Sequence, residues 1–494
     1  MFEAAEVGHK LSKGKYRKIE PKLRAELLEA QFALSKNGRF PVIILISGVR
    51  GAGKGETVNL LNEWMDARYI HTYAFDNPSD EERERPPMWR YWRVLPPKGR
   101  IGILFGSWYT APIIDRVFKR SRRGDLARSI EEIRNFEKML ADDGALLLKF
   151  WFHLSKPQQR KRLKAIESNP ETRWRITRRD WDFFKGYDRF YRISEETLRE
   201  TSTAHAPWIV VEGTDPEYRS VMVGRTLLQF LRKRLDEKKP AGSKAFSAVV
   251  VRPVDDVHVL SRLDLSIAVK KEKYEKELRR LQGELALLTR DKRFSAHNVV
   301  LVFEGMDAAG KGGAIRRVTA ALDARLYHTI PIAAPTDEER AQPYLWRFWR
   351  HIPRKGRFTI YDRSWYGRVL VERIEGFCAE ADWMRAYSEI NEFEEQLVRN
   401  GAIIAKFWLQ ISKEEQHRRF KERERIRFKQ FKITPEDWRN RSRWDDYQTA
   451  AVDMIERTST VQAPWTLVES NDKYWARLKI LKALRNQIRT RLDT

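Results

Sequence analysis

The chain has 494 residues with 42% apolar and 12% aromatic content, which is ample for burial but exceeds what one compact core holds. A single cysteine, Cys378, excludes an internal disulfide framework, no apolar stretch is long enough for a bilayer, and the N-terminal stretch lacks the apolar core of a secretory signal, so we expect a cytoplasmic protein. The net charge of +26 predicts a polyanionic partner such as nucleic acid, an anionic membrane or a phosphate-rich substrate, with a basic, well-solvated surface as the alternative.

The first half contains a short β-rich run, PVIILIS from Pro41, that ends at a glycine-rich loop. The residues after Lys54 suit a helix, and β-rich runs follow as RIGILF from Arg100, ALLLKFWFHL from Ala145 and APWIVVE from Ala206. Long helical patterns precede the last two runs. Strands that alternate with helices predict a parallel sheet covered on both faces.

A stretch with Lys, Pro, Gly and Ser, DEKKPAGSKAFSAVVVRPVDD from Asp236, is typical of a connector between domains. A charged helix is predicted from Lys270, with an apolar stripe at helical spacing formed by Tyr274, Leu278, Leu281, Leu285 and Leu288. Such a stripe usually packs on its own domain, and a role in forming a homo-oligomer is the alternative.

The second half repeats the first. Gly48 corresponds to Gly305, Lys54 to Lys311 and Trp208 to Trp465, always at a separation of 257 residues and without a gap. Two copies are too few for a solenoid, and each has the size of one α/β domain. We therefore expect an α/β protein with two tandem domains, residues 1–235 and 270–494, joined by a connector at 236–269.

Both copies carry the phosphate-loop motif G-x-x-x-x-G-K where a strand passes into a helix. At such a junction the backbone N–H groups and the helix dipole hold phosphate, and this context distinguishes the motif from a chance glycine match. A purely structural turn is the alternative. In the second copy the predicted loop comprises Lys311 together with Gly305, Met306, Ala308, Ala309, Gly310, Gly312 and Gly313.

The motif departs from its usual form at the residue after the lysine. A Ser or Thr there normally gives a hydroxyl to Mg²⁺, but the copies have Gly55 and Gly312. Mg²⁺ prefers oxygen ligands, and Asp307 in the loop and Asp362 at the end of the run RFTIYD are placed to supply them. We predict that Asp307 and Asp362 are the metal ligands; a helix cap and a loop aspartate are the alternative.

The first copy lacks both carboxylates. Arg50 stands at the position of Asp307, and Phe105-Gly106 stand at the positions of Asp362-Arg363. A site without metal ligands cannot neutralise the charge that develops on a transferring phosphoryl group. We therefore expect the N-terminal copy to be degenerate and catalytically inert, acting either as an anion-binding domain or as a scaffold.

The runs EGMDAAGKGGAIRRV, LWRFWRHIPRKGRFTIYDRSWYGRVLVERIEGF and RTSTVQAPWTLVESNDKYWAR resemble the polyphosphate kinase 2 family in its two-domain form. The resemblance covers essentially both halves. It implies a P-loop kinase-like core with a helical lid in each domain, and an activity that uses inorganic polyphosphate to convert AMP to ADP. Asp307, Lys311 and Asp362 match the family pattern, as do Arg363 and the pair Glu372-Arg373, whereas the first half departs at the acidic positions.

On this reading Lys311 contacts the transferring phosphates, Asp307 and Asp362 hold Mg²⁺ or Mn²⁺, and Arg363 acts on the charge of the transition state. Polyphosphate offers charge and nothing apolar, so we expect a groove of cations, formed by Arg316, Arg317, Arg347, Arg350, Lys355 and Arg357; ordinary solvated charges are the alternative. The basic stretch from Arg419 is the predicted lid, with phosphate contacts from Arg427, Lys429 and Lys432, and an exposed helix as the alternative. The resemblance implies nucleotide contacts from Glu372, Arg373, Asp445, Asp446, Asn471 and Asp472.

Other functions remain open at this stage. ADP in place of AMP keeps the mechanism and changes the acceptor. An ATP-dependent nucleoside monophosphate kinase fits less well, because the loop lacks Ser or Thr and the positive charge is in excess. A nucleic-acid-binding P-loop protein is the non-enzymatic alternative, but no nucleic-acid module accompanies the charge. We expect inorganic polyphosphate and AMP or ADP as partners, and neither nucleic acid nor a membrane.

Overall fold

The structure, a computed structural model, describes residues 1–237 and 258–493, apart from the side chains of residues 428, 429 and 432. These residues form two compact units. The first contains Met1–Pro78, residues 90–237 and Pro335–Arg347, and the second contains Ser79–Trp89, residues 258–334 and residues 348–493. Much of the expected connector, 236–269, lies outside the described residues.

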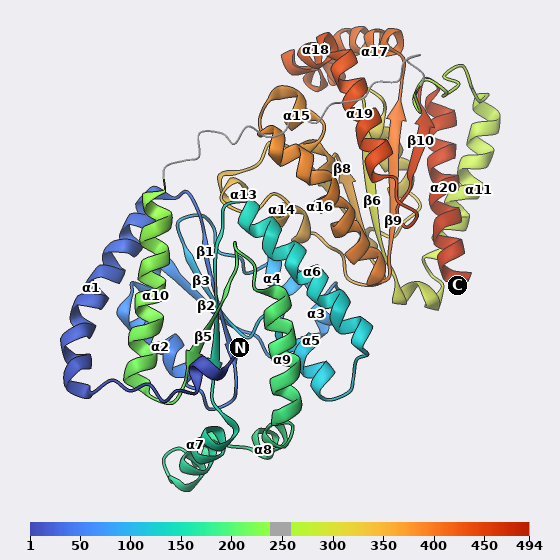
Figure 1. The fold of residues 1–494 in the computed structure, drawn as a ribbon. Helices are drawn as coiled ribbons and strands as arrows, with labels where there is room; N and C mark the ends of the chain where they lie inside the picture. The colour runs from blue at the N-terminus through green and yellow to red at the C-terminus, as the bar shows by residue number, and fades with distance from the viewer. Residues whose placement is uncertain (238–257, 494) are drawn as a thin grey trace. The chain divides into compact units, whose positions relative to one another are not determined.

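Each unit contains one sheet of five parallel strands (Figure 1). In the first unit the order is β2-β3-β1-β4-β5, and the strands are β1 (Val42–Gly48), β2 (Ile70–Ala74), β3 (Ile101–Phe105), β4 (Leu146–His153) and β5 (Trp208–Glu212). In the second unit the order is β10-β9-β6-β8-β7, and the strands are β6 (Asn298–Gly305), β7 (Tyr327–Pro331), β8 (Phe358–Asp362), β9 (Ala402–Gln410) and β10 (Trp465–Glu469). The two sheets therefore have the same topology, and the predicted parallel sheets are confirmed.

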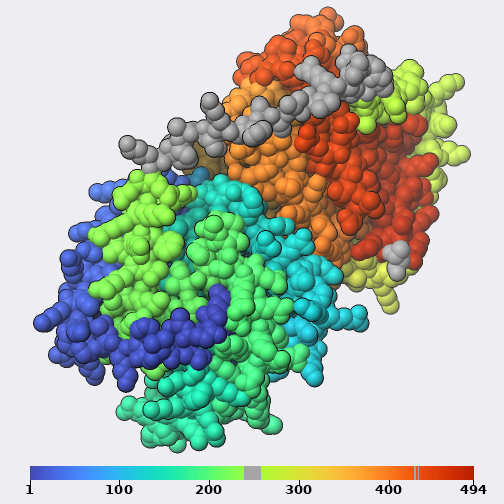
Figure 2. Space-filling view, viewed as in Figure 1, coloured from blue at the N-terminus to red at the C-terminus, as the bar shows by residue number. Residues whose placement is uncertain are grey.

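Helices cover both faces of each sheet. The helices of the first half are α1 (Lys13–Asn37), α2 (Lys54–Trp64), α3 (Asp80–Arg83), α4 (Trp89–Trp92), α5 (Thr110–Val117), α6 (Arg123–Asp142), α7 (Lys156–Ser168), α8 (Arg178–Lys185), α9 (Tyr187–Thr201) and α10 (Pro216–Asp236). Helices α1, α2 and α10 pack together on one face, and α5, α6 and α9 pack together on the other (Figure 1). The side-by-side packing of α1 and α10 is also visible at the molecular surface (Figure 2).

The second half repeats this arrangement with α11 (Lys271–Leu288), α12 (Lys311–Thr319), α13 (Asp337–Arg340), α14 (Trp346–Trp349), α15 (Val371–Glu375), α16 (Glu380–Arg399), α17 (Lys413–Arg425), α18 (Pro435–Ser442), α19 (Trp444–Thr458) and α20 (Lys473–Asp493). The predicted apolar stripe on α11 packs against α20 of its own unit. In the part of the chain that the structure describes, no helix combines the length and apolar character that a bilayer crossing requires.

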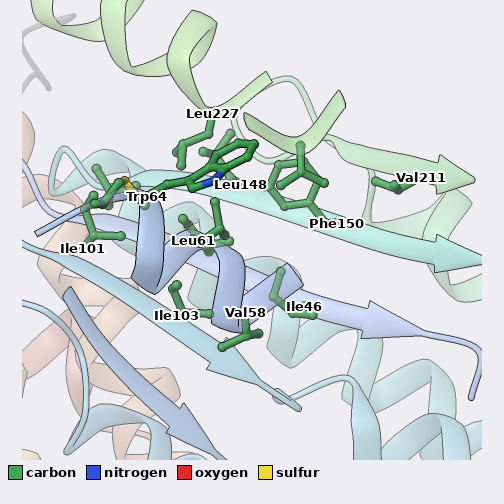
Figure 3. Packing of buried hydrophobic residues seen from close by; sticks show 14 of the residues in the cluster. Ile46, Val58, Leu61, Trp64, Ile101, Ile103, Leu148, Phe150, Val211 and Leu227 are labelled. Atoms are coloured by element: carbon green, nitrogen blue, oxygen red, sulfur yellow. The ribbon is translucent and has the colours of Figure 1, made fainter. Parts of the chain in front are cut away.

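The core of the first unit is continuous across the sheet (Figure 3). Val58, Leu61 and Trp64 follow one another at helical spacing on α2 and pack over Ile103 and Phe150 of the sheet, and all five side chains are buried. Fully burying an apolar side chain of this kind contributes about 1.5–3 kcal/mol. This packing fixes α2, and hence its first residue Lys54, against the carboxyl ends of the strands.

Candidate active site

The phosphate loop of the second unit connects β6 to α12. Gly305 has φ 145°, and a Cβ atom there would lie 2.4 Å from the carbonyl oxygen of Leu409, so this position accepts only glycine. Gly310, the residue before α12, has φ 107°, and Ala308 has φ 61°. The left-handed residues turn the chain tightly enough to bring the loop over the N-terminus of α12.

Side chains hold each carbonyl group of this loop from Gly305 to Ala309. Lys311 donates to the carbonyl oxygens of Gly305 (2.8 Å) and Met306 (3.3 Å). The next three carbonyl groups are bound by Gln416 (3.0 Å to Asp307 O), Arg419 (2.8 Å to Ala308 O) and Ser470 (2.6 Å to Ala309 O). In a planar peptide the C=O and the following N–H point in opposite directions. The N–H of Ala309 donates to Met306 O (3.1 Å) within the loop. The other N–H groups that follow these carbonyl groups are oriented to the opposite side, where phosphate oxygens can accept from them.

The ammonium group of Lys311 lies among charged groups of both signs. Burial lowers the pKa of Lys311, and the nearby positive charge of Arg363 lowers it further. The carboxylates of Asp307, Asp362 and Glu304 oppose this shift. Three negative neighbours thus favour the charged form of the lysine, which a phosphate-binding group requires.

Asp307 is held by two side chains from other elements. Its Oδ1 accepts from Arg363 (2.9 Å) and its Oδ2 accepts from Asn440 of α18 (2.9 Å). Burial raises the pKa of Asp307, but the charges of Lys311 and Arg363 outweigh burial, so the pKa lies below its usual range. The carboxylate is therefore ionised at neutral pH and fixed in orientation.

Asp362 ends β8 next to the phosphate loop. It lies opposite Phe303 of β6 in the sheet register, and its Oδ2 lies 4.0 Å from the position that a Cβ atom at Gly312 would occupy. Arg363, the following residue, has a left-handed backbone with φ 65°. A backbone conformation that a non-glycine residue rarely adopts is typical of functional sites.

The donor set of Asp307 and Asp362 suits a hard cation such as Mg²⁺. Carboxylate oxygens are its preferred protein ligands, and phosphate oxygens and water usually complete the shell. Within residues 1–237 and 258–493, no cluster of three or more His, Cys, Asp or Glu side chains is arranged to bind a metal ion. A cation at this site would therefore depend on the substrate for several of its ligands.

Several residues of this site were not among the predicted loop-binding residues, although Arg419 begins the predicted lid stretch. Gln416, Arg419 and Asn440 bind the loop from α17 and α18, and Ser470 binds it from the turn after β10. The spacing of Gln416 and Arg419 places both on one face of a helix, which is the only hint in the sequence. Glu304, at the end of β6, is buried, and burial raises its pKa while Ser364 donates to its Oε1 (2.8 Å).

Only some of the residues of the predicted cation groove lie near the phosphate loop. Arg316 and Arg317 lie on α12, the helix that begins at Lys311. Lys355 and Arg357 precede β8, whereas the loop lies beyond its other end, roughly 13 Å along the strand. The structure therefore does not bring Lys355 and Arg357 together with the phosphate loop.

The remaining basic candidates have varied surroundings. Arg347 belongs to the segment Pro335–Arg347 of the first unit and pairs with Glu339 (3.2 Å), and Arg350 is exposed. Arg427 is exposed in the turn after α17, and the side chains of Lys429 and Lys432 lie outside the described residues. Arg477 of α20, which the sequence interpretation missed, has its Nη2 3.3 Å from the position of a Cβ atom at Gly313.

Most of the predicted nucleotide contacts form local interactions in the structure. Arg373 pairs with Asp453 (2.7 Å), and Glu372 pairs with Arg368 (2.9 Å). Asp446 pairs with Arg443 (3.1 Å), and Asp445 is exposed. Asn471 accepts from the backbone of Ser412 (3.0 Å), and Asp472 accepts from the backbone of Trp475 (2.6 Å) at the start of α20. The last two residues thus have a structural role at the turn after β10.

A family model for polyphosphate kinase 2 (PPK2) matches residues 10–239 and 268–493 of this chain. The chain belongs to the polyphosphate kinase 2 family. Both halves match the same model, so the resemblance and the predicted fold class, two tandem P-loop kinase-like domains, are confirmed.

Individual members of the family agree over nearly the full length. The chain is 58% identical to the polyphosphate:AMP phosphotransferase of Pseudomonas aeruginosa, over 99% of this chain and 98% of that protein. It is 39% identical to the polyphosphate:AMP phosphotransferase of Acinetobacter johnsonii, over 96% and 97%. A crystal structure of a polyphosphate kinase 2 from Pseudomonas aeruginosa superposes with a TM-score of 0.89 at 55% identity, covering 100% of this chain and 99% of that chain.

The phosphate loop of the first unit has the same lysine contacts as that of the second, but Arg50 replaces the negatively charged Asp307. Lys54 donates to the carbonyl oxygens of Gly48 (2.8 Å) and Val49 (2.6 Å), as Lys311 does in the second unit. Arg50 pairs with Asp180 of α8 and lies 4.3 Å from the ring centre of Phe183, which stands where the second unit has Asn440. The loop of the second unit is linked to α18 through the carboxylate of Asp307, whereas the loop of the first is linked to α8 through the guanidinium of Arg50.

We expect Lys54 to titrate near neutral pH. Burial lowers its pKa to about 7, the positive charge of Arg50 contributes, and only Asp180 opposes the shift. Because the pKa in the folded state lies below the ordinary value, the fold binds fewer protons than the unfolded chain and gains stability as the pH rises from about 7 towards 10. Lysine-labelled NMR measures the titration directly.

The resonance of Lys54 is assigned as the lysine signal that is missing from the spectrum of the Lys54→Met variant. It is expected to change near pH 7, whereas Lys311, which has three carboxylate neighbours, is expected to titrate at a higher pH. A Lys54 resonance that moves only above pH 10 contradicts the prediction.

Proposed function

We propose that this protein transfers the terminal phosphate of inorganic polyphosphate to AMP and produces ADP, in its second unit. The observation that carries the proposal is the pair Asp307 and Asp362 around Lys311 on a phosphate loop, an arrangement that the first unit lacks. Nearly full-length relatives named polyphosphate:AMP phosphotransferases support the choice of donor and acceptor.

In the proposed reaction an oxygen of the AMP phosphate attacks the terminal phosphorus of polyphosphate. The bond from that phosphorus to its bridging oxygen breaks, and the donor leaves one phosphate shorter. Phosphoryl transfer depends mainly on positioning and on charge stabilisation. The loop N–H groups and Lys311 hold the phosphate oxygens, and Arg363 faces the charge that spreads over them.

Asp307 and Asp362 would hold a divalent cation, Mg²⁺ in our proposal with Mn²⁺ as the alternative. When bound, the cation neutralises charge on the phosphate oxygens. Arg363 and Asn440 keep Asp307 in one orientation for this task. The basic segment after α17 excludes water from the transferring phosphate, which limits hydrolysis.

ADP is the second candidate acceptor. The chain is also 41% identical to the ADP-polyphosphate phosphotransferase of Pseudomonas aeruginosa, over 44% of this chain and 72% of that protein. The same loop chemistry serves either acceptor, since only the receiving phosphate differs. We place the activity in the cytoplasm, which agrees with a single cysteine.

The decisive assay gives the purified protein long-chain polyphosphate and Mg²⁺, with AMP and ADP offered separately and ATP replacing polyphosphate as a control. We expect ADP from AMP and polyphosphate, and loss of the product when a chelator removes the cation. Product from ADP alone changes the acceptor and keeps the mechanism. Product only with ATP contradicts the proposal.

A further inference from the structure

A pocket of about 540 Å³ in the first unit is lined mainly by arginines. It lies among α5, α6 and α9, which pack against one another (Figure 1). Its lining includes Arg116, Arg123, Arg189 and Arg192, together with Leu126 and Glu196. Four guanidinium groups against one carboxylate give the pocket a strongly positive charge.

Little of this charge is neutralised within the protein. Arg123 and Glu196 approach to 3.6 Å, but their side chains are 86% and 45% exposed, so the pair is weak. Arg192 donates to the carbonyl oxygen of Asp188 at 3.4 Å. Among the described residues, neither Arg116 nor Arg189 takes part in an ion pair, which leaves their charge for a ligand.

The second unit carries much less positive charge at the corresponding positions. At the positions that correspond to Arg123, Arg189 and Arg192, the second unit has Glu380, Asp446 and Thr449. Arg373, the counterpart of Arg116, is neutralised by Asp453 (2.7 Å) and covered by Trp383, whose ring centre lies 4.3 Å from the guanidinium carbon. In the first unit that tryptophan is replaced by Leu126.

The two units thus differ in two respects. The first unit lacks the carboxylates that a reaction requires, and it has arginines at three pocket positions where the second unit has Glu380, Asp446 and Thr449. A domain that served only as a scaffold has no need of unpaired arginines in a pocket, because guanidinium groups without partners repel one another.

We propose that this arginine pocket binds a stretch of inorganic polyphosphate and makes the first unit a docking domain for the donor; the identity of the ligand rests on the proposed function. Guanidinium groups bind phosphate oxygens in pairs of hydrogen bonds and stay charged at all physiological pH values. The pocket lining contains no aromatic side chain on which a base could stack. A chain of phosphates, which needs cations and no apolar surface, therefore fits better than a nucleotide.

The test measures binding of labelled polyphosphate of defined length to the full chain in EDTA, which removes the cation-dependent contribution of the second unit. The background carries Lys311→Ala so that the other phosphate loop contributes little. The pocket variant is Arg116→Gln, Arg189→Gln and Arg192→Gln. The control variant removes the same charge from exposed positions on α1 and α10, by Arg17→Gln, Lys18→Gln and Arg225→Gln.

We expect the pocket variant to bind polyphosphate at least about tenfold more weakly and with a smaller salt dependence, and the control to change less than about twofold. A second variant, Arg123→Glu, Arg189→Asp and Arg192→Thr, carries the residues of the second unit and should weaken binding further. Equal weakening in pocket and control variants overturns the proposal, because bulk charge then explains binding.

Competition identifies the ligand class. Unlabelled polyphosphate should displace the probe, and AMP or duplex DNA at equal phosphate concentration should not; equal displacement by either contradicts polyphosphate as the occupant. The pocket variant in the unmodified background is also assayed for ADP formation at saturating polyphosphate. If the pocket variant binds polyphosphate and forms ADP as the unmodified chain does, the docking pocket is refuted and the proposed function stands. If the pocket substitutions weaken binding but the unmodified chain forms no ADP, the proposed function is refuted and the docking pocket stands.

Discussion

Lys311→Ala is expected to lower the turnover of AMP to ADP by at least about 10²–10³-fold, whereas Lys54→Ala should leave most of it. Both lysines donate to loop carbonyl oxygens in the same way, so the two substitutions disturb the two loops alike. Only Lys311 has carboxylates of the metal-binding type beside it. The difference in turnover between the two variants therefore measures the part that Lys311 takes in the reaction, and not a change in loop structure.

Steady-state kinetics of the two variants, with far-ultraviolet circular dichroism as a folding check, measure this difference. Asp362→Asn is the companion variant, because it removes a charge from the second site without changing its volume, and it should lose turnover to a similar extent. Comparable losses from Lys54→Ala and Lys311→Ala would refute the assignment of a single active unit.

Lys406→Met is expected to destabilise the second unit by about 3–5 kcal/mol. Lys406 is fully buried in β9 and donates to Glu394 (2.7 Å), to the hydroxyl oxygen of Tyr366 (2.8 Å) and to the carbonyl oxygen of Thr458 (2.8 Å). Methionine fills similar space but leaves the Glu394 carboxylate buried without its counter-ion. An uncompensated buried charge is among the most destabilising changes in a protein.

The first unit supplies the matched control. Lys149 donates to Glu137 (2.7 Å), Tyr109 (3.1 Å) and the carbonyl oxygen of Thr201 (2.7 Å), and Lys149→Met should cost the first unit a similar amount. Chemical denaturation of the full chain, followed as two transitions, assigns each loss to its unit. In the double variant Glu394→Gln with Lys406→Met, part of the loss should be recovered. A loss below about 1 kcal/mol would contradict the prediction.

This network also separates structure from catalysis. The first unit keeps the buried lysine, glutamate and tyrosine but has no counterparts of Asp307 and Asp362. The buried network common to both units therefore serves the fold, whereas Asp307 and Asp362 are candidates for the reaction.

The sequence predicts the fold well because its strongest signals are local. The apolar runs, the glycine loops and the 257-residue repeat determine the strands and the position of the loop. The grouping of Ser79–Trp89 with the second unit and Pro335–Arg347 with the first carries no such signal, because both segments contain the same DEER run.

The site was predictable only where its residues lie in the motif. Asp307 and Lys311 lie in the loop, and Asp362 ends the neighbouring strand, which places it at the same edge of a parallel sheet. Gln416 and Asn440 reach the loop from distant segments, and a single sequence gives no distance between such segments. Lys355 and Arg357 are close to Asp362 in the chain but lie at the other end of β8, so closeness in sequence does not place them beside the loop.

The carbonyl contacts of α17 have a consequence for the timing of product release. Gln416 and Arg419 belong to α17, the helix that leads into the predicted lid segment. A lid that opens by tilting α17 withdraws two donors from the loop, so the cradle loosens its hold on the phosphates in the same movement that exposes them to solvent. If the proposed lid opens in this way, we expect the departure of ADP and the relaxation of the loop to occur together.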